Sequence, residues 1–178
     1  LFHRTLSVGA RFGVIVVLRD RAAVEVSTFR SDEAYVDGRH PTAVRFTTPE
    51  EDARRRDFTI NAMFHDPLRR KTIDPVGGLK DLQRRLVRAV GDPEERFRED
   101  HLRMLRAVRF TARLGFRLAP TTRRAIRKLA PLIRETSGER IRDELAQMLT
   151  EPTRVEAMRR ADELRLLGEI LPEVTAMR

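Results

Sequence analysis

The chain has 178 residues, of which 40% are hydrophobic, so one or two packed domains are expected and wholesale disorder is excluded. The absence of cysteine excludes disulfides and thiolate sites, and no apolar run approaches the roughly 20 residues of a membrane helix, so we expect a cytoplasmic protein with no membrane partner. Basic residues outnumber acidic ones by 36 to 27, a net charge of +9, and all but three are arginine, which indicates either a polyanionic partner or a genomic bias toward arginine.

The first part of the chain reads as β structure. Residues 14–18 form an apolar run typical of a buried strand, and residues 23–29 predict a second strand after a turn at 20–21. Residues 31–47 have few apolar positions and predict a loop. Since Leu1 is not a methionine and the first residues resemble the interior of a sheet, we expect an internal fragment of a longer protein.

A short mixed region follows. Thr48 and the Pro-Glu-Glu after it are typical of a helix start, and this helix is expected to end near Arg56. Residues 58–64 predict a strand, residues near 72–73 another short strand, and residues 74–78 a tight turn.

After residue 92 the sequence predicts helices only. Asp92 and Pro93 open a helix that should run without interruption to a glycine cap at Gly115. Further helices are expected at about 121–134, 138–149 and 153–167, with Pro120, Ser137-Gly138, Pro152 and Gly168 between them. The fold class predicted is therefore α+β, with a partial sheet at the front and an all-helical part behind.

The long helix carries the first candidate site. Its predicted buried face holds Phe97, His101, Met104, Leu105, Val108 and Ala112. On the polar side, Asp100 and Arg103 are i, i+3 neighbours, which predicts either a solvent-facing ion pair or a pair that reads a base. Cytosine and adenine both present an amino donor beside a ring-nitrogen acceptor, so an aspartate and an arginine together could accept these bases and reject guanine and uracil.

Two more arginines extend this row. Arg106 and Arg109 follow Arg103 at intervals of three, which covers about 9 Å of helix, a length comparable to a triphosphate. Because each step also turns the helix by about 300°, Arg109 should lie on the side opposite Asp100. Arg109 is therefore the least certain of the four to reach the same ligand.

A second candidate site follows the first predicted helix. The segment Arg54-Arg55-Arg56 could simply complement the helix dipole. With Asp57 and Asn61 after it, the segment could equally bind phosphate and ribose hydroxyls.

Metal-binding signals are weak. Glu25, between two valines, predicts either an exposed strand carboxylate or one beside a metal site. No Asp-x-Asp pair occurs, and the four histidines show no metal-ligand spacing, so no complete metal site is expected.

Taken together, these segments resemble the class II tRNA nucleotidyltransferase and bacterial poly(A) polymerase family. The resemblance spans nearly the whole chain. It rests on the ordered segments 55–62, 74–82, 88–93, 96–103, 105–110, 114–116 and 139–145.

The resemblance implies a nucleotidyltransferase head over residues 1–91, a helical neck over 92–150 that binds nucleotide and RNA, and the start of a body over 151–178. It implies that Arg56, Asp100, Arg103, Arg106 and Arg109 contact the nucleotide, with Asp57 by the ribose. The segment 74–78 would join head to neck, and residues 139–144 would stiffen the neck. The family's Mg²⁺-binding Asp-x-Asp pair should lie upstream of Leu1, so the fragment alone should be inactive.

Three functional hypotheses remain open. The first is a fragment of an enzyme that adds C and A to tRNA 3′ ends from CTP and ATP, with Mg²⁺ in the full-length protein. Within this hypothesis, a poly(A) polymerase of the same family, or an enzyme that adds only CC or only A, is the alternative. The second hypothesis is a non-catalytic, arginine-rich RNA-binding module, and the third is a structural helical domain with biased composition.

Overall fold

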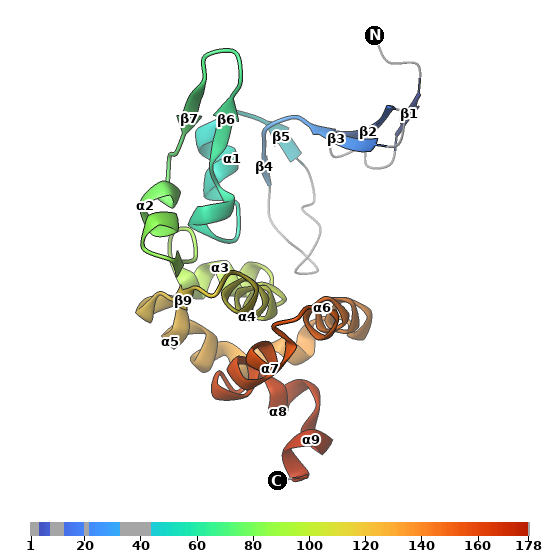
Figure 1. Cartoon of the computed structure of the whole chain (residues 1–178), viewed down its shortest axis with the longest axis vertical. Coiled ribbons are helices and arrows are strands. Elements are labelled where there is room, and N and C mark those ends of the chain that lie inside the picture. Colours follow the sequence, from blue (N-terminus) through green and yellow to red (C-terminus); the bar gives the residue numbers. More distant parts are fainter. Residues whose placement is uncertain (1–3, 8–12, 20–21, 33–43, 178) are drawn as a thin grey trace.

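The computed structural model describes residues 4–7, 13–19, 22–32 and 44–177. Within them, short strands and helices form the first part of the chain and helices form the rest, which confirms the predicted α+β class (Figure 1). The predicted turn at 20–21 and most of the predicted loop at 31–47 lie outside the described residues.

The first sheet has three antiparallel strands in the order β1 (Thr5–Leu6), β2 (Val14–Arg19) and β3 (Ala22–Ser27). The two predicted strands are confirmed, but the burial predicted for residues 14–18 is wrong. Val17 is the one buried residue of β2, and every residue of β3 is exposed. The reason is visible in Figure 1, where this sheet extends away from the helices rather than lying under them.

The segment around the first helix contains two strand pairs. Strands β4 (Arg30–Asp32) and β5 (Val44–Phe46) pair in antiparallel fashion, and α1 (Pro49–Arg54) begins as predicted, because the Thr48 hydroxyl accepts a hydrogen bond from the Glu51 backbone N–H. Strands β6 (Phe64–Asp66) and β7 (Lys71–Ile73) then form a hairpin.

The strand predicted over 58–64 is wrong. Phe58 keeps one bridge to Ala89, and the chain then turns into the 3₁₀ helix η2 (Thr59–Asn61). Side chains cause this turn: the Asn61 amide donates to Asp57, and the Thr59 hydroxyl donates to the buried Asp81 carboxylate at 2.8 Å.

A further helix was not predicted. Helix α2 (Gly78–Gln83) follows the turn at 74–78, whose Asp74 carboxylate accepts hydrogen bonds from the backbone N–H groups of Gly78 and Leu79. A Cβ at Gly78 would lie 2.1 Å from the Thr59 carbonyl oxygen, so only glycine lets α2 approach η2 this closely.

The predicted helix from 93 to 114 is two helices, α3 (Pro93–Glu99) and α4 (Arg103–Leu114). Asp100 between them is extended, with φ −153° and ψ 105°, and its carboxylate accepts the Leu102 backbone N–H. This side-chain bond starts a new helix where the apolar spacing alone predicts continuity. The predicted end is confirmed, because Gly115 adopts the left-handed conformation at φ 63°.

The remaining helices are α5 (Pro120–Leu129), η3 (Ala130–Glu135), α6 (Gly138–Thr150), α7 (Arg154–Glu163), α8 (Leu166–Ile170) and α9 (Pro172–Ala176). The predicted stop at Gly168 is wrong: the break falls at Arg165, which has φ 67°, and Gly168 lies inside α8. Parallel strands β8 (Leu86–Val87) and β9 (Arg117–Leu118) connect the two parts of the chain.

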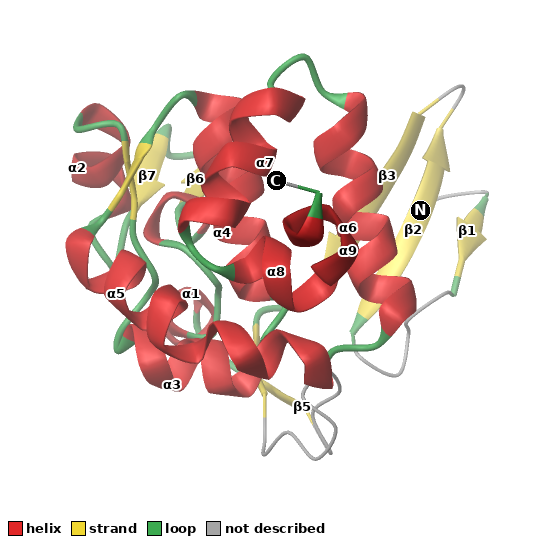
Figure 2. Cartoon of the chain, turned by 90° about the horizontal axis from the view of Figure 1, so that it is seen from below, coloured by secondary structure: helices red, strands yellow, loops and turns green. Residues whose placement is uncertain are grey.

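The core lies in the helical part, where α4 packs against α6 and α7 (Figure 2). Phe97, Met104, Leu105, Val108 and Ala112 are buried, as the apolar spacing predicts. His101 instead lies in the turn between α3 and α4, 3.8 Å from a Glu135 carboxylate oxygen. No helix of the described segments is long and apolar enough to span a bilayer.

Candidate functional site

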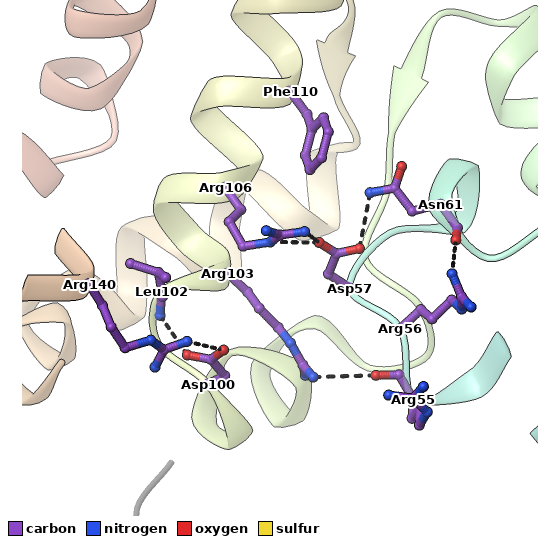
Figure 3. A pocket seen from close by; sticks show the side chains of 10 residues that line it. All are labelled: Arg55, Arg56, Asp57, Asn61, Asp100, Leu102, Arg103, Arg106, Phe110 and Arg140. Atoms are coloured by element: carbon purple, nitrogen blue, oxygen red, sulfur yellow. Dashed lines mark hydrogen bonds and ion pairs between the residues drawn. The ribbon is translucent and has the colours of Figure 1, made fainter. Parts of the chain in front are cut away.

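A cavity of about 640 Å³ opens where η2, the α3–α4 break and α6 meet (Figure 3). It is lined by Arg55, Arg56, Asp57, Asn61, Asp100, Leu102, Arg103, Arg106, Phe110 and Arg140. Side chains from both parts of the chain therefore meet in one place. All the residues that the sequence predicted to bind nucleotide are among them, with the exception of Arg109.

Asp100 is fixed at the cavity wall by two donors. One carboxylate oxygen accepts the Leu102 N–H at 3.1 Å, and the other accepts Arg140 Nη2 at 2.8 Å. Of the two alternatives for Asp100 and Arg103, the solvent-facing ion pair is wrong, because the break after α3 removes the helical i, i+3 geometry. Among the described residues, Arg140 is the ion-pair partner of Asp100. A carboxylate has about four acceptor positions, so about two remain for a ligand.

Arg103 is held beside Asp100 by a separate set of acceptors. Its Nη1 donates to Glu99 at 2.7 Å and to the Arg96 carbonyl at 3.0 Å, while Nη2 donates to the Arg55 carbonyl at 3.3 Å. The last bond joins the helical part to the end of α1. Within the described part of the chain, the Nε–H and one Nη2–H of Arg103 have no acceptor, so donors also remain for a ligand.

Asp57 and Arg106 close the other side of the cavity. Arg106 donates Nε at 2.9 Å and Nη2 at 2.7 Å to one Asp57 oxygen, and the other oxygen accepts the Phe58 N–H and the Asn61 amide. The Phe110 ring lies 5.4 Å from the Arg106 guanidinium carbon, which gives this arginine an apolar support. The Nη1 group of Arg106 has no acceptor in the regions that the structure describes.

Arg55 and Arg56 are not placed by the helix dipole alone. Arg55 donates Nε and Nη2 to one oxygen of the buried Asp52 carboxylate, and Arg56 donates Nε to the other at 2.9 Å. Burial raises the pKa of Asp52, but the hydrogen bonds from the Arg30 backbone N–H and from these arginines outweigh it. The pKa of Asp52 therefore lies below its ordinary value.

Arg109 points away from the cavity. Its Nε donates to Glu144 of α6 at 2.6 Å, both side chains are buried, and the Phe110 ring lies 4.6 Å from its guanidinium carbon. Arg109 therefore faces the interface between α4 and α6. This placement follows the helical turn that the sequence predicts for it.

Sequence reasoning did not select Leu102, Phe110 or Arg140 as site residues, and it included Arg55 only as part of the segment 54–56. All of these residues lie within the family-like segments, which is the signal that could have indicated them. The contact between Arg140 and Asp100 joins residues 40 positions apart, so no local pattern reveals it.

Glu25 does not line the cavity. It is exposed on β3, opposite Val16 of β2, and its neighbouring valines are half-exposed rather than turned into a core. No group of three or more His, Cys, Asp or Glu side chains that could hold a metal ion occurs in the described ranges. The residues that the structure describes therefore do not form a metal site.

Two family profiles match the chain. The "Poly A polymerase head domain" matches residues 1–88, and the "Probable RNA and SrmB- binding site of polymerase A" matches residues 115–178. The CCA-adding enzyme of Geobacillus thermodenitrificans is 46% identical over 159 residues, which are 89% of this chain and 39% of that enzyme. The chain thus spans about two fifths of the length of this relative.

Solved structures have a similar fold. The CCA-adding enzyme of Bacillus stearothermophilus in complex with CTP matches 93% of this chain and 40% of its own, with a TM-score of 0.82 and 43% identity. A tRNA nucleotidyltransferase complexed with a primer tRNA and an incoming ATP analogue matches 90% of this chain and 45% of its own, with a TM-score of 0.77 and 30% identity.

Proposed function

The chain belongs to the nucleotidyltransferase family of the poly(A) polymerase head domain and the CCA-adding enzymes, and from this premise we propose that it is the nucleotide-selecting part of an enzyme that adds C and A to tRNA 3′ ends. Its substrates would be CTP, ATP and the tRNA 3′ end. Residues 1–91 would be the head, 92–150 the neck and 151–178 the start of the body. A cytoplasmic location remains a prediction.

The observation that carries this proposal is that unused hydrogen-bond acceptors and unused donors lie side by side in one cavity. Asp100 keeps free acceptor positions beside the free N–H groups of Arg103. In our proposal Asp100 accepts the exocyclic amino group of cytosine or adenine, and Arg103 donates to the adjacent ring nitrogen. Guanine and uracil present the inverted pattern, so they would leave buried groups unpaired at a cost of about 1–3 kcal/mol each.

The other cavity residues are assigned by their positions. Arg106 and Arg56 would bind phosphate oxygens, because a guanidinium presents paired donors to them. Asp57 and Asn61, which are bonded to each other, would contact the ribose hydroxyls. The reaction itself would be attack of the RNA 3′-hydroxyl on the α-phosphate with departure of pyrophosphate, and these residues would orient the nucleotide for it.

Nucleotidyltransferases of this family are generally metal-dependent. The residues described here do not fit a Mg²⁺ site, and Glu25 alone could not hold the ions. The proposal therefore assigns no metal-dependent step to this chain.

The test is equilibrium binding of the four ribonucleoside triphosphates to the 178-residue chain, measured by titration calorimetry. We expect CTP and ATP to bind at least about tenfold more tightly than GTP and UTP, since one unpaired buried group accounts for that ratio. Asp100→Ala should abolish the preference. Asp143→Ala is the matched control, because Asp143 is exposed on α6 and pairs with Arg142 outside the cavity.

The alternatives give different results. Binding of ATP without CTP would favour the poly(A) polymerase hypothesis. RNA binding with a steep salt dependence and no nucleotide preference would favour the RNA-binding module. Equal affinity for all four nucleotides, or a preference that survives Asp100→Ala, would contradict the assignment of Asp100.

A further inference from the structure

Six exposed arginines outside the cavity lie on neighbouring elements, and we call them the arginine ridge. It runs from the end of α2 across β9 and along α5, and it consists of Arg84, Arg85, Arg117, Arg123, Arg124 and Arg127. Figures 1 and 2 both place α2 and α5 on the side of the molecule away from α6. The ridge is therefore separate from the cavity that Arg140 of α6 helps to line.

Backbone contacts hold the parts of the ridge together. The Arg117 N–H donates to the Arg85 carbonyl at 2.9 Å in the β8–β9 pair, and Arg117 and Arg123 line the same cavity of about 310 Å³. On α5, Thr122, Ala125, Ile126 and Leu129 are buried. Because those positions face the core, the arginines between them face solvent along the whole helix.

The charge of the ridge is not matched by the protein. None of the six side chains makes an ion pair or hydrogen bond with another described residue, whereas all of the cavity arginines do. The acids at its borders are mostly engaged: Glu94 holds Lys128 at 2.7 Å, and Glu156 holds Arg160 at 2.6 Å. Glu163, which lines the same small cavity as Arg117 and Arg123, has no ion-pair partner among the described residues.

Arg85 adds a second observation. It has φ 52°, a left-handed conformation that glycine or asparagine adopts more readily than arginine. At this position, where α2 and β9 meet, an exposed arginine occupies a backbone conformation that is typical of glycine.

We propose that the arginine ridge binds the phosphate backbone of RNA, as a surface additional to the nucleotide cavity. A row of guanidinium groups whose N–H donors are unpaired can bind successive phosphates. Such contacts do not distinguish one base from another. The matched RNA-binding profile covers residues 115–178 without specifying a surface, and Arg84 and Arg85 lie outside it. These contacts involve only the RNA backbone. The ridge could therefore fail to bind RNA while Asp100 and Arg103 still select the base in the cavity.

The test measures the affinity of the 178-residue chain for a fluorescent tRNA transcript by anisotropy over a series of salt concentrations. The ridge variant is Arg124→Gln/Arg127→Gln. The matched control is Arg134→Gln/Arg142→Gln, which removes the same charge from exposed arginines that already have the partners Glu169 and Asp143. Both pairs are exposed, so thermal melting should show folded protein in each case.

We expect the ridge variant to weaken RNA binding roughly tenfold or more. The slope of log K against log salt concentration should become shallower by about two, one for each lost phosphate contact. The control should change affinity less than twofold. CTP binding should be unchanged in both variants, which separates this proposal from the function of the cavity. Equal RNA affinity of the two variants, an unchanged salt slope, or no RNA binding by the chain would overturn it.

Discussion

The buried carboxylate of Asp52 connects β4 to the end of α1. It accepts hydrogen bonds from the Arg30 backbone and from the Arg55 and Arg56 side chains. Arg56 then donates Nη1 to the Asn61 carbonyl at 3.1 Å, which ties the end of α1 to η2. A single buried charge thus positions two of the arginines that face the cavity.

Asp52→Asn should lower the free energy of unfolding at pH 7 by about 1.5–3 kcal/mol, the range for hydrogen bonds to charged groups. The lowered pKa of Asp52 means that its stabilisation is fully present above the unfolded value near ~4 and is lost as pH falls through the folded value. Urea unfolding from pH 7 to pH 3 should therefore show a difference between wild type and variant that shrinks with acidity. A difference independent of pH would contradict this account.

At the scale of elements, α6 makes two ion pairs, one with the α3–α4 break and one with α4, and the two contacts serve different purposes. Arg140 reaches Asp100 at the cavity wall, whereas Arg109 and Glu144 form a buried pair at 2.6 Å within the helix interface. The segment expected to stiffen the neck contains both partners from α6. In this structure the row of arginines on α4 divides between ligand-facing and helix-facing positions.

Arg109→Met should destabilise the fold by about 3–5 kcal/mol, because it leaves the Glu144 charge buried and unpaired. The double variant Arg109→Met/Glu144→Leu should recover much of that loss, since apolar side chains of similar volume can replace a buried ion pair. Chemical denaturation of the wild type, both single variants and the double variant measures the coupling.

The same double variant tests the predicted nucleotide contact of Arg109. If Arg109 acts only in packing, the double variant should bind CTP as the wild type does. A stable double variant that has lost CTP affinity would show that Arg109 reaches the nucleotide after all.

Local patterns predicted most element types, and long-range contacts decided the exceptions. Capping residues placed the starts of α1 and α3, and Gly115 placed the end of α4. The break at Asp100 escaped prediction because Phe97, Met104 and Val108 keep helical spacing across it. The ion pair with Arg140 joins the break to α6, 40 positions along the chain, and no sequence window contains both residues.

The sequence predicted which residues form the candidate site better than it predicted which of them contact one another. Asp57, Asn61, Asp100, Arg103 and Arg106 do line one cavity. Their partners differ from those expected, because Arg103 pairs with Glu99 and Arg106 crosses to Asp57, 49 positions away. Such pairings depend on how α4 packs against the first part of the chain, which spacing along one helix does not specify.

At the scale of the whole molecule, burial is uneven. The helical part contains the main core around α4, while the β1–β3 sheet extends outward with Val24 and Val26 at 52% and 45% exposure. Elements with few buried apolar side chains open locally more easily than core helices do.

Hydrogen–deuterium exchange followed by mass spectrometry should therefore distinguish these regions in the 178-residue chain. Amides of β2 and β3 should exchange at least roughly a hundredfold faster than those of α4, because local opening free energies range from about 0 to the global value. Equal protection in the two regions would mean that the sheet is covered in solution.

The ion pairs of the cavity offset much of the positive charge of its arginines. Arg103 already holds Glu99, Arg106 holds Asp57, and Arg140 holds Asp100. An incoming polyanion therefore meets guanidinium groups that already have internal counter-ions, and it binds through the N–H groups that these ion pairs leave unused. Simple anions gain little from such a site, so the positions of the remaining donors and acceptors select the ligand.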